Sequence, residues 1–384
     1  MKKFLSLILV LGLSATLLAG CGGSNSSSDT GDSGETASND SGYDTLNIIA
    51  AHGATEAVAE HAAFVKFKEL VEERSGGSVT VDIYPNQQLG GDREYTESCV
   101  QGNVTMGGPS TAAIAALCPS LNAFETPFLF SDYETARATM KSDAGKALLA
   151  SMESAGLKGL GYFENGFRNL TCNKEINTLA DMKGLKIRVM ENEIHLAIWT
   201  ALGTNPSPLA FGELYTALQQ GAFDAEENPL EQIYNTKFQE VQDHVYLTQH
   251  IYTPYVVYMN LDIWNGLNEQ TQQLIQECMD EAVEYNYETL CDANNQTCID
   301  GINNSGMSKV YEVSDELRRR WSRLAPTPAC MTSHRGRWRH LCPGSVGRCW
   351  FRVLRKPLYA GLKRLYGKRL PGCLAVSSRI IGPC

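Results

Sequence analysis

The stretch from Leu202 to Pro229 carries the most specific pattern in the chain and reads LGTNPSPLAFGELYTALQQGAFDAEENP. Near its end, Asn228 has an amide with both donor and acceptor groups, and Pro229 biases it towards an extended backbone. Asn228 is therefore a candidate binding residue, although Asn-Pro is also a common turn signal. Phe211 is either a contact for the carbon skeleton of a bound molecule or a core aromatic.

On both sides of this stretch, segments with strand periodicity alternate with segments that carry a helical apolar face. The predicted strands are residues 46–52, 79–85, 159–163, 185–189 and 255–260. Helices are expected over residues 54–75, from Asp92 onwards, and through most of residues 268–305. Asp92 comes near the start of its helix, where a carboxylate suits the helix dipole. The alternation predicts an α/β architecture with mainly parallel sheets.

The N-terminus has the pattern of an export signal. Lys2 and Lys3 precede an apolar run that ends in the sequence Leu-Ala-Gly-Cys at residues 18–21. The run is too short for a transmembrane helix and predicts a signal peptide over residues 1–20. A cysteine at the cleavage position resembles the lipobox of bacterial lipoproteins, which predicts a lipid anchor on Cys21; a signal peptide with an incidental cysteine is the alternative. The polar residues up to position 43 are expected to form a flexible tether.

The charge of the chain changes abruptly near its C-terminus. From Arg318 to Cys384 there are 13 arginines, three lysines and no acidic residue, together with five of the 12 cysteines. All 43 acidic residues precede this segment, so an acidic body argues against a nucleic-acid partner. We interpret residues 317–384 as an out-of-frame tail, because a functional basic arm is usually low in Cys and Trp. A true basic appendage that binds acidic polymer or lipid is the alternative.

The segments described so far resemble those of the extracytoplasmic solute-binding proteins of TRAP transporters, the DctP family. The resemblance is carried by the stretch from Leu202 to Pro229 and by His52 after the first strand. It is also carried by the motifs PNQQLGGDRE at residues 85–94, ENGFR at 164–168 and GLKIR at 184–188. It extends from about residue 46 to 316.

This resemblance implies a periplasmic-binding-protein-like fold with two α/β lobes, a ligand cleft between them and crossing hinge segments. On this resemblance, residues 44–316 are expected to form the binding domain. Lobe one comprises about 44–167 plus 256–290, and lobe two about 168–255 plus 291–316. The implied partners are a small organic acid, such as a C4-dicarboxylate or a sugar acid, and the TRAP permease subunits. We expect an extracytoplasmic monomer that touches the membrane only through its anchor.

Two arginines are the leading candidates for binding the acid. A guanidinium presents a planar fork of donors that matches a carboxylate, and the resemblance gives Arg188 this role. It gives Arg168 a second cationic contact. The alternatives are a surface salt bridge for Arg188 and an ion pair between the lobes for Arg168. For Asn228 the resemblance also favours ligand contact, while both roles of Phe211 stay open.

Four further positions match places where relatives contact their ligands: His52, Asp92, Ser110 and His250. A lone histidine is more often a structural group than a ligand contact. Ala225-Glu226 stands where many relatives have Gly-Gln, and we expect this departure to lie outside the direct contacts of the ligand.

Motifs for catalysis and for metal binding are missing from the sequence. It has no phosphate-binding loop, no Gly-x-Ser-x-Gly elbow, no His-Glu-x-x-His and no zinc-spaced pairs of cysteines. We therefore expect no catalytic residue, no metal and no cofactor. An extracellular sugar-acid enzyme and a sensory binding protein remain as alternative functions. Between Cys21 and the tail lie six cysteines, an even number that permits disulfides but does not define their pairing.

Overall fold

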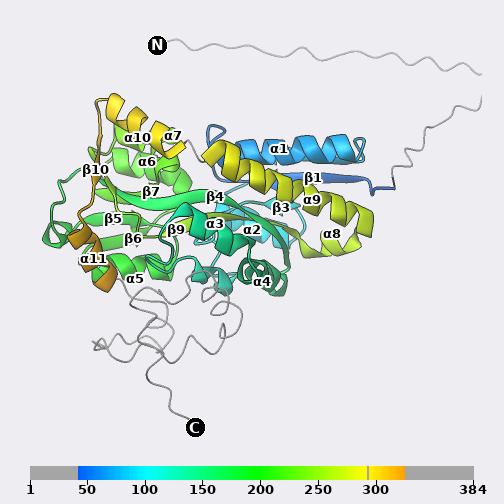
Figure 1. The fold of residues 1–384 in the computed structure, drawn as a ribbon, viewed down its shortest axis with the longest axis horizontal. Coiled ribbons are helices and arrows are strands. Elements are labelled where there is room, and N and C mark those ends of the chain that lie inside the picture. Colours follow the sequence, from blue (N-terminus) through cyan, green and yellow to red (C-terminus); the bar gives the residue numbers. More distant parts are fainter. Residues whose placement is uncertain (1–41, 292–293, 325–384) are drawn as a thin grey trace, which may run out of the picture. The chain divides into compact units, whose positions relative to one another are not determined.

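The computed structural model describes residues 42–291 and 294–324, which form a mixed α/β structure (Figure 1). The strands are β1 (Leu46–Ala51), β2 (Val79–Tyr84), β3 (Met106–Gly107), β4 (Leu157–Cys172), β5 (Lys186–Val189), β6 (Asn205–Pro208), β7 (Ala225–Pro229), β8 (His244–Leu247), β9 (Tyr252–Asn260) and β10 (Lys309–Glu312). The α-helices are α1 (Ala59–Arg74), α2 (Asp92–Val100), α3 (Tyr133–Lys141), α4 (Asp143–Ser151), α5 (Glu193–Ala201), α6 (Phe211–Gln219), α7 (Leu230–Asn235), α8 (Leu261–Gly266), α9 (Glu269–Tyr285), α10 (Asn294–Asn304) and α11 (Asp315–Leu324). Short 3₁₀ helices are η1 (Pro119–Ala123), η2 (Met152–Ala155), η3 (Leu179–Met182) and η4 (Phe238–Glu240), and the π-helix η5 (Asn286–Cys291) follows α9.

Two long strands connect the two halves of the fold. Strand β4 pairs antiparallel with β9 over its first part and with β7 and β8 over its last part. The strand order is β2-β1-β3-β9-β4-β7-β5-β6, with β8 between β4 and β10. Strands β1 to β3 pair in parallel at one end, and β5 pairs in parallel with β6 and β7 at the other. The sheet is therefore mixed rather than mainly parallel as expected, because the crossing strands run in opposite directions.

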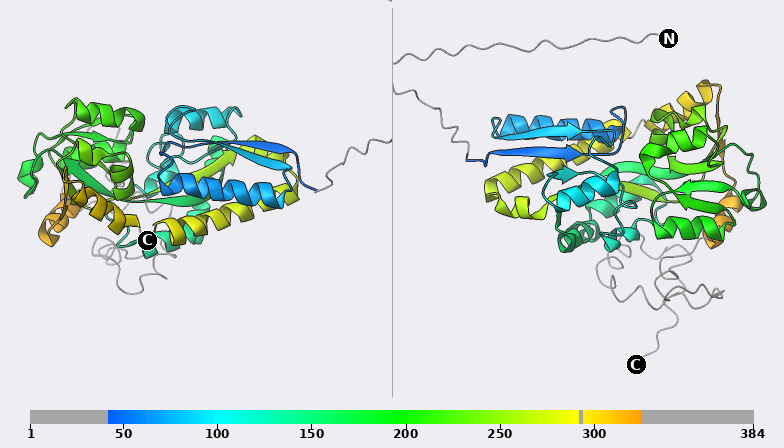
Figure 2. Two further views of the ribbon diagram at one scale, coloured as in Figure 1. Left: turned by 90° about the horizontal axis from the view of Figure 1, so that it is seen from above. Right: turned by 180° about the vertical axis from the view of Figure 1, so that it is seen from behind.

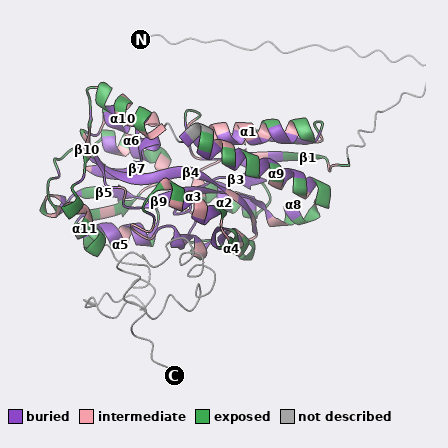
Figure 3. Ribbon diagram, in the orientation of Figure 1, coloured by how far each residue is buried: buried purple, intermediate pink, exposed green. Residues whose placement is uncertain are grey.

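The buried apolar residues form three clusters that define the lobes used below. One cluster contains residues from 48–167 and 252–287, and we call this part lobe one. The other two draw on residues 170–251 and 298–321, and we call this part lobe two. Helices α1 and α9 lie side by side on lobe one, where Arg74 and Glu281 form a salt bridge (Figure 2). All nine residues of β9, and most of β4, are buried (Figure 3).

Helix α1 shows how local sequence fixes the elements near the site. Its apolar residues Ala63, Phe64, Phe67, Leu70 and Val71 recur at three- and four-residue spacing and are buried in lobe one. The helix ends before two consecutive glycines, both with positive φ. At its start, the backbone N–H of Ala59 donates to the Glu231 carboxylate from α7, at 2.7 Å. The first turn of α1 is therefore held between the two lobes.

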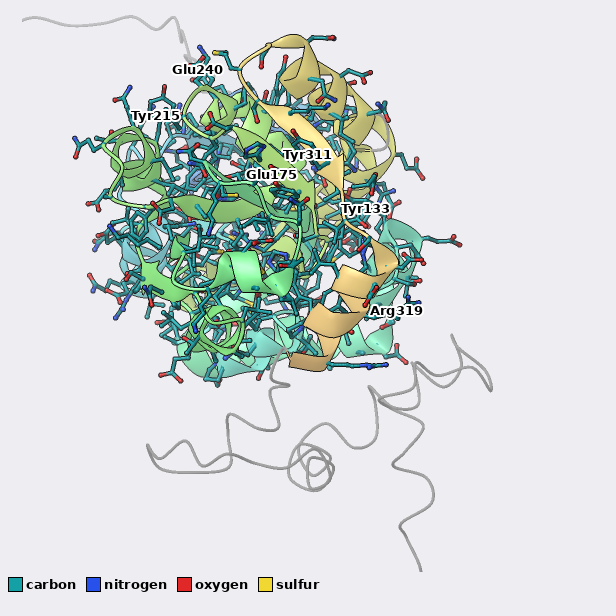
Figure 4. All side chains as sticks on the ribbon, turned by 90° about the vertical axis from the view of Figure 1, so that its left-hand side faces the viewer. Tyr133, Glu175, Tyr215, Glu240, Tyr311 and Arg319 are labelled. Carbon is teal, nitrogen blue, oxygen red and sulfur yellow. The ribbon has the colours of Figure 1, made fainter. Side chains whose placement is uncertain are left out.

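Helix α11 includes the first residues of the segment interpreted above as an out-of-frame tail. Residues 317–324 belong to this helix, and Trp321 is 1% exposed. Its indole packs edge-on to Trp199 at 5.1 Å and stacks on His250 at 5.2 Å. Figure 4 labels Arg319, an exposed residue of α11, and Tyr311 of the preceding strand β10. The rest of the expected tail, from residue 325, lies outside the described residues, as do the signal peptide and Cys21.

Candidate functional site

Arg188 lies on β5 with its guanidinium buried and only partly bonded. Its Nε and Nη2 donate to the carbonyl oxygen of Leu209, at 2.8 and 2.6 Å. Its Nη1 is buried and has no hydrogen-bond partner among the described residues. Burial, and then the positive charge of Arg168, lowers the pKa of Arg188 to about 10. An anion is the group that would satisfy Nη1 and offset the cost of burying this charge.

Arg168 lies on β4 and is bonded by the protein itself. Its Nε is 2.5 Å from Glu227 Oε2, and its Nη2 is 2.9 Å from Glu227 Oε1. Nη2 also donates to Asn228 Oδ1, at 3.1 Å. Burial alone would lower the pKa of Arg168, but the charge of Glu227 outweighs it, and the pKa is raised. Arg168 therefore forms an ion pair, but this pair lies between β4 and β7 within lobe two and not between the lobes.

Glu227 is the centre of a buried network that the sequence reasoning missed. Besides Arg168, it contacts His195 Nδ1 at 3.3 Å and His250 Nε2 at 3.0 Å. The other nitrogen of His195 is 2.8 Å from Glu125 Oε2, which belongs to lobe one. Although burial raises the pKa of Glu227, Arg168 and His195 bring it well below its usual range. Glu227 is thus ionised and fixes the position of the Arg168 guanidinium.

Asn228 joins Arg168 to a second buried glutamate. Its Oδ1 accepts from Arg168, and its Nδ2 donates to Glu226 Oε2 at 2.5 Å. Glu226 also accepts from Thr171 Oγ1, at 2.9 Å. Burial raises the pKa of Glu226 to about 7, although both hydrogen bonds act to lower it. Glu226 therefore helps to fix the orientation of the Asn228 amide.

Asp92 and Ser110 are residues of lobe one that lie close to Arg188. The backbone N–H of Ser110 and the hydroxyl of Tyr95 both donate to the Asp92 carboxylate, each at 3.1 Å. Ser110 Oγ lies 3.8 Å from the sulfur of Met190, two residues after Arg188. Burial raises the pKa of Asp92 to about 6, while Arg188 lies close enough for its charge to act against this rise.

The remaining predicted site residues pack mainly against protein. His52 stacks on Phe64 at 5.3 Å, and its pKa is lowered to about 3 by burial and then by His61. His250 is held by Glu227, by Thr248 Oγ1 and by stacking on Trp321. Phe211 packs edge-on to Phe238 at 6.0 Å. These contacts suit the structural roles named as alternatives for His250 and Phe211, whereas the buried Nδ1 of His52 has no hydrogen-bond partner among the described residues.

Direct contacts hold the lobes together around the arginines. Asn192 Nδ2 of lobe two donates to Ala112 O and to Asn122 Oδ1 of lobe one, at 3.1 and 3.0 Å. Gly212 lies so near lobe one that a Cβ atom there would be 2.4 Å from Gln87 Oε1. The arrangement encloses the Arg188 guanidinium within protein, where a charged hydrogen bond is stronger than in water.

Some other site types are absent from the described parts of the chain. Residues 42–291 and 294–324 contain no group of three or more His, Cys, Asp or Glu residues placed to hold a metal ion. Within the same ranges, no helix has the length and apolarity needed to cross a membrane. Five of the cysteines are free, buried thiols: Cys99, Cys118, Cys172, Cys278 and Cys298.

A family model and a relative of known function both match this chain. The family model for bacterial extracellular solute-binding proteins, family 7 (DctP), matches residues 50–326. The C4-dicarboxylate-binding periplasmic protein DctP of Rhodobacter capsulatus is 33% identical over 260 residues, which are 67% of this chain and 78% of that protein.

Two solved structures illustrate the similarity of fold. A TRAP periplasmic solute-binding protein from Sulfurospirillum deleyianum with bound succinate is 30% identical, with a TM-score of 0.69, over 73% of this chain and 92% of that one. The sugar acid binding protein of Advenella mimigardefordensis in complex with galactonate is 32% identical, with a TM-score of 0.71, over 73% and 90%. The prediction of a two-lobed α/β fold is confirmed.

Proposed function

The chain belongs to family 7 of the bacterial extracellular solute-binding proteins, the DctP family of TRAP transporters, and from this premise we propose that it captures an organic acid through the Arg188 guanidinium. Members of this family are transport proteins rather than enzymes, so the extracellular enzyme left open by the sequence is set aside. The observation that carries the proposal is the buried Nη1 of Arg188, which lacks a partner among the residues described.

The surroundings of Arg188 suit a carboxylate. Leu209 O accepts from Nε and Nη2 along one edge of the guanidinium, which leaves Nη1 as the buried N–H group without a partner among the described residues. Arg168 adds positive charge nearby, because it contributes to the lowered pKa of Arg188. A bound carboxylate would satisfy Nη1 and would also relieve the repulsion between the two arginines.

Arg168 is proposed to act in the same site while it remains paired with Glu227. The pair holds the Arg168 guanidinium in one orientation, and the two histidines hold Glu227. An arginine fixed in this way loses little entropy when it meets a ligand. Asn228 and Asp92 would then supply the donor and acceptor groups that recognise the rest of the acid.

The acid would be collected outside the cytoplasm and delivered to TRAP permease subunits. The signal peptide over residues 1–20 and the lipobox-like Cys21 support export followed by lipid anchoring. The tether up to residue 43 would let a monomeric binding domain reach the permease. Relatives that bind succinate or galactonate support the class of organic acids and leave its member open.

Isothermal titration calorimetry with the full chain tests this function. The panel should contain dicarboxylates, sugar acids and keto acids, with neutral sugars and amines as controls. We expect saturable binding of at least one carboxylate and none of the uncharged analogues. Binding of neutral sugars or amines, with no response to any acid, would reject the proposal.

A further inference from the structure

A second unsatisfied buried group lies on the lobe-one side of the site. Glu60, in the first turn of α1, is 0% exposed, and neither carboxylate oxygen has a hydrogen-bond partner within the described part of the chain. The facing nitrogen of His52, Nδ1, also lacks a bonded partner there and is 3.9 Å from Glu60 Oε2. A buried carboxyl without partners is costly, so this position calls for an explanation other than stability.

Several elements surround the Glu60 carboxyl closely. The backbone after β3 passes beside it, since a Cβ atom on Gly108 would lie 2.9 Å from Glu60 Oε1. Asp92 of α2 and Glu231 of α7 lie close enough for their charges to act on it. Burial, then Asp92, then Glu231 raises the pKa of Glu60 well above its usual range. Tyr255 of β9 also lies near this group: burial, and then the charges of the three carboxyl groups, raise its pKa well above its usual range.

The three carboxyl groups of Glu60, Asp92 and Glu231 are linked to the arginine side of the site through Asp92. Asp92 interacts electrostatically with both Glu60 and Arg188. The backbone N–H of Ser110, two residues after Gly108, donates a hydrogen bond to Asp92. The Ser110 hydroxyl contacts the sulfur of Met190, which follows Arg188 by two residues. The site therefore has a cationic end at Arg188 and Arg168, and an acidic end at Glu60, Asp92 and Glu231.

The difference between the cationic end and the acidic end restricts which acids this site can bind. A plain dicarboxylate would place its second carboxylate against three acidic groups, and each of them that is ionised would repel it in a buried site. A hydroxyl can donate to an ionised carboxyl and accept from a protonated one, so it suits Glu60 in either state. Glu231 is already engaged by Ala59 N–H, which leaves Glu60 as the acidic group with both oxygens unsatisfied by the described residues.

We propose that Glu60 binds hydroxyl groups at the end of the ligand remote from its carboxylate, and that the ligand is a polyhydroxylated monocarboxylate. This inference rests on the proposed function and adds the class of acid. Arg188 holds the carboxylate, and Glu60, assisted by Asp92, selects for hydroxyl groups over a second carboxylate.

The test compares hydroxylated and plain acids on the full chain by calorimetry, using galactonate and galacturonate against succinate and hexanoate. We expect a hydroxylated acid to bind at least tenfold more tightly than succinate. Glu60→Met should weaken its binding at least tenfold and change hexanoate or succinate less than threefold. Glu60→Gln, which keeps hydrogen-bonding groups, should fall between Glu60→Met and the unmodified protein, and it remains informative if the Met variant does not fold.

The matched control is Glu69→Met, an exposed position on the same helix, which should leave all affinities unchanged. A preference for succinate, or hydroxylated-acid binding unaffected by Glu60→Met, would overturn the inference while leaving the organic-acid function intact. No binding of any acid would instead reject the proposed function.

Discussion

Replacement of Arg188 by lysine should weaken acid binding far more than a change that conserves charge normally does. In the structure, Nε and Nη2 are both committed to Leu209 O, at 2.8 and 2.6 Å, and Nη1 remains for the ligand. A lysine has one nitrogen, which cannot hold Leu209 O in this way and also occupy the position of Nη1. The variant therefore keeps the charge and loses at least one charge-assisted hydrogen bond.

The size of this effect follows from that one bond. A hydrogen bond to a charged group contributes about 1.5–3 kcal/mol, which corresponds to a loss of affinity of roughly 10- to 150-fold. Calorimetry of Arg188→Lys with the best acid of the panel measures it, after a thermal melt has shown that the variant is folded. An affinity within threefold of the unmodified protein would place the ligand away from Nη1 and refute this reasoning.

Arg74→Lys is the matched control for this experiment. Arg74 also makes a two-bond contact, with both Glu281 oxygens at 2.7 Å, but it lies between α1 and α9 on an exposed surface. The change should leave the affinity unaltered and lower the free energy of unfolding by no more than about 1 kcal/mol. Equal losses of affinity in both variants would show that binding responds to general loosening of the fold.

Three further predictions concern stability and location. Burial raises the pKa of Glu226 to about 7, so this group favours the folded state at low pH, and that contribution is lost as the pH rises through about 7. Glu226→Gln should therefore flatten the fall in Tm between pH 5 and 8 and add roughly 2 kcal/mol of stability at pH 8; an unchanged profile would show that Glu226 does not titrate in this range. Trp321→Ala should destabilise the protein by about 3–5 kcal/mol in denaturant melts, whereas Arg323→Ala, an exposed position on the same helix, should change it by less than about 0.5 kcal/mol. If both have small effects, α11 does not pack as described. Cys21→Ser should leave an unprocessed precursor or release the protein from the membrane fraction, and mature-sized protein that still pellets with membranes would argue against a lipid anchor.

The sequence predicted the elements whose signals are local. Strand β1, the core of α1 and the start of α2 at Asp92 follow from periodicity and dipole preference over a few residues. Arg188 could be placed on a strand for the same reason. Its unsatisfied Nη1 could not be predicted, because it depends on Leu209, 21 positions later, closing against the other edge of the guanidinium.

Strand β4 was predicted too short for a physical reason. Residues 164–168 are mostly polar or glycine, a composition that suggests a loop after the strand. In the structure they continue the strand, because distant groups satisfy them. The Glu164 carboxylate bonds to Arg137, and its N–H donates to Asn286 Oδ1, 122 positions away. Partners at such separations leave no pattern in a single sequence.

The network around Glu227 was missed for the same reason. His195 lies 32 positions from Glu227 and 70 from Glu125, and each is unremarkable in isolation. The available signal was the pair Glu226-Glu227 in a short strand whose five residues are all buried. Charged residues are almost never fully buried unless paired, so a predicted buried strand with two glutamates should prompt a search for a cation.

A crystal structure of the full chain with its preferred acid tests the central claim most directly. The account predicts a ligand carboxylate oxygen within hydrogen-bond distance of Arg188 Nη1, with Leu209 O still bonded to the other edge of the guanidinium. An acid bound elsewhere, or bound in this site without contact to Nη1, would contradict it.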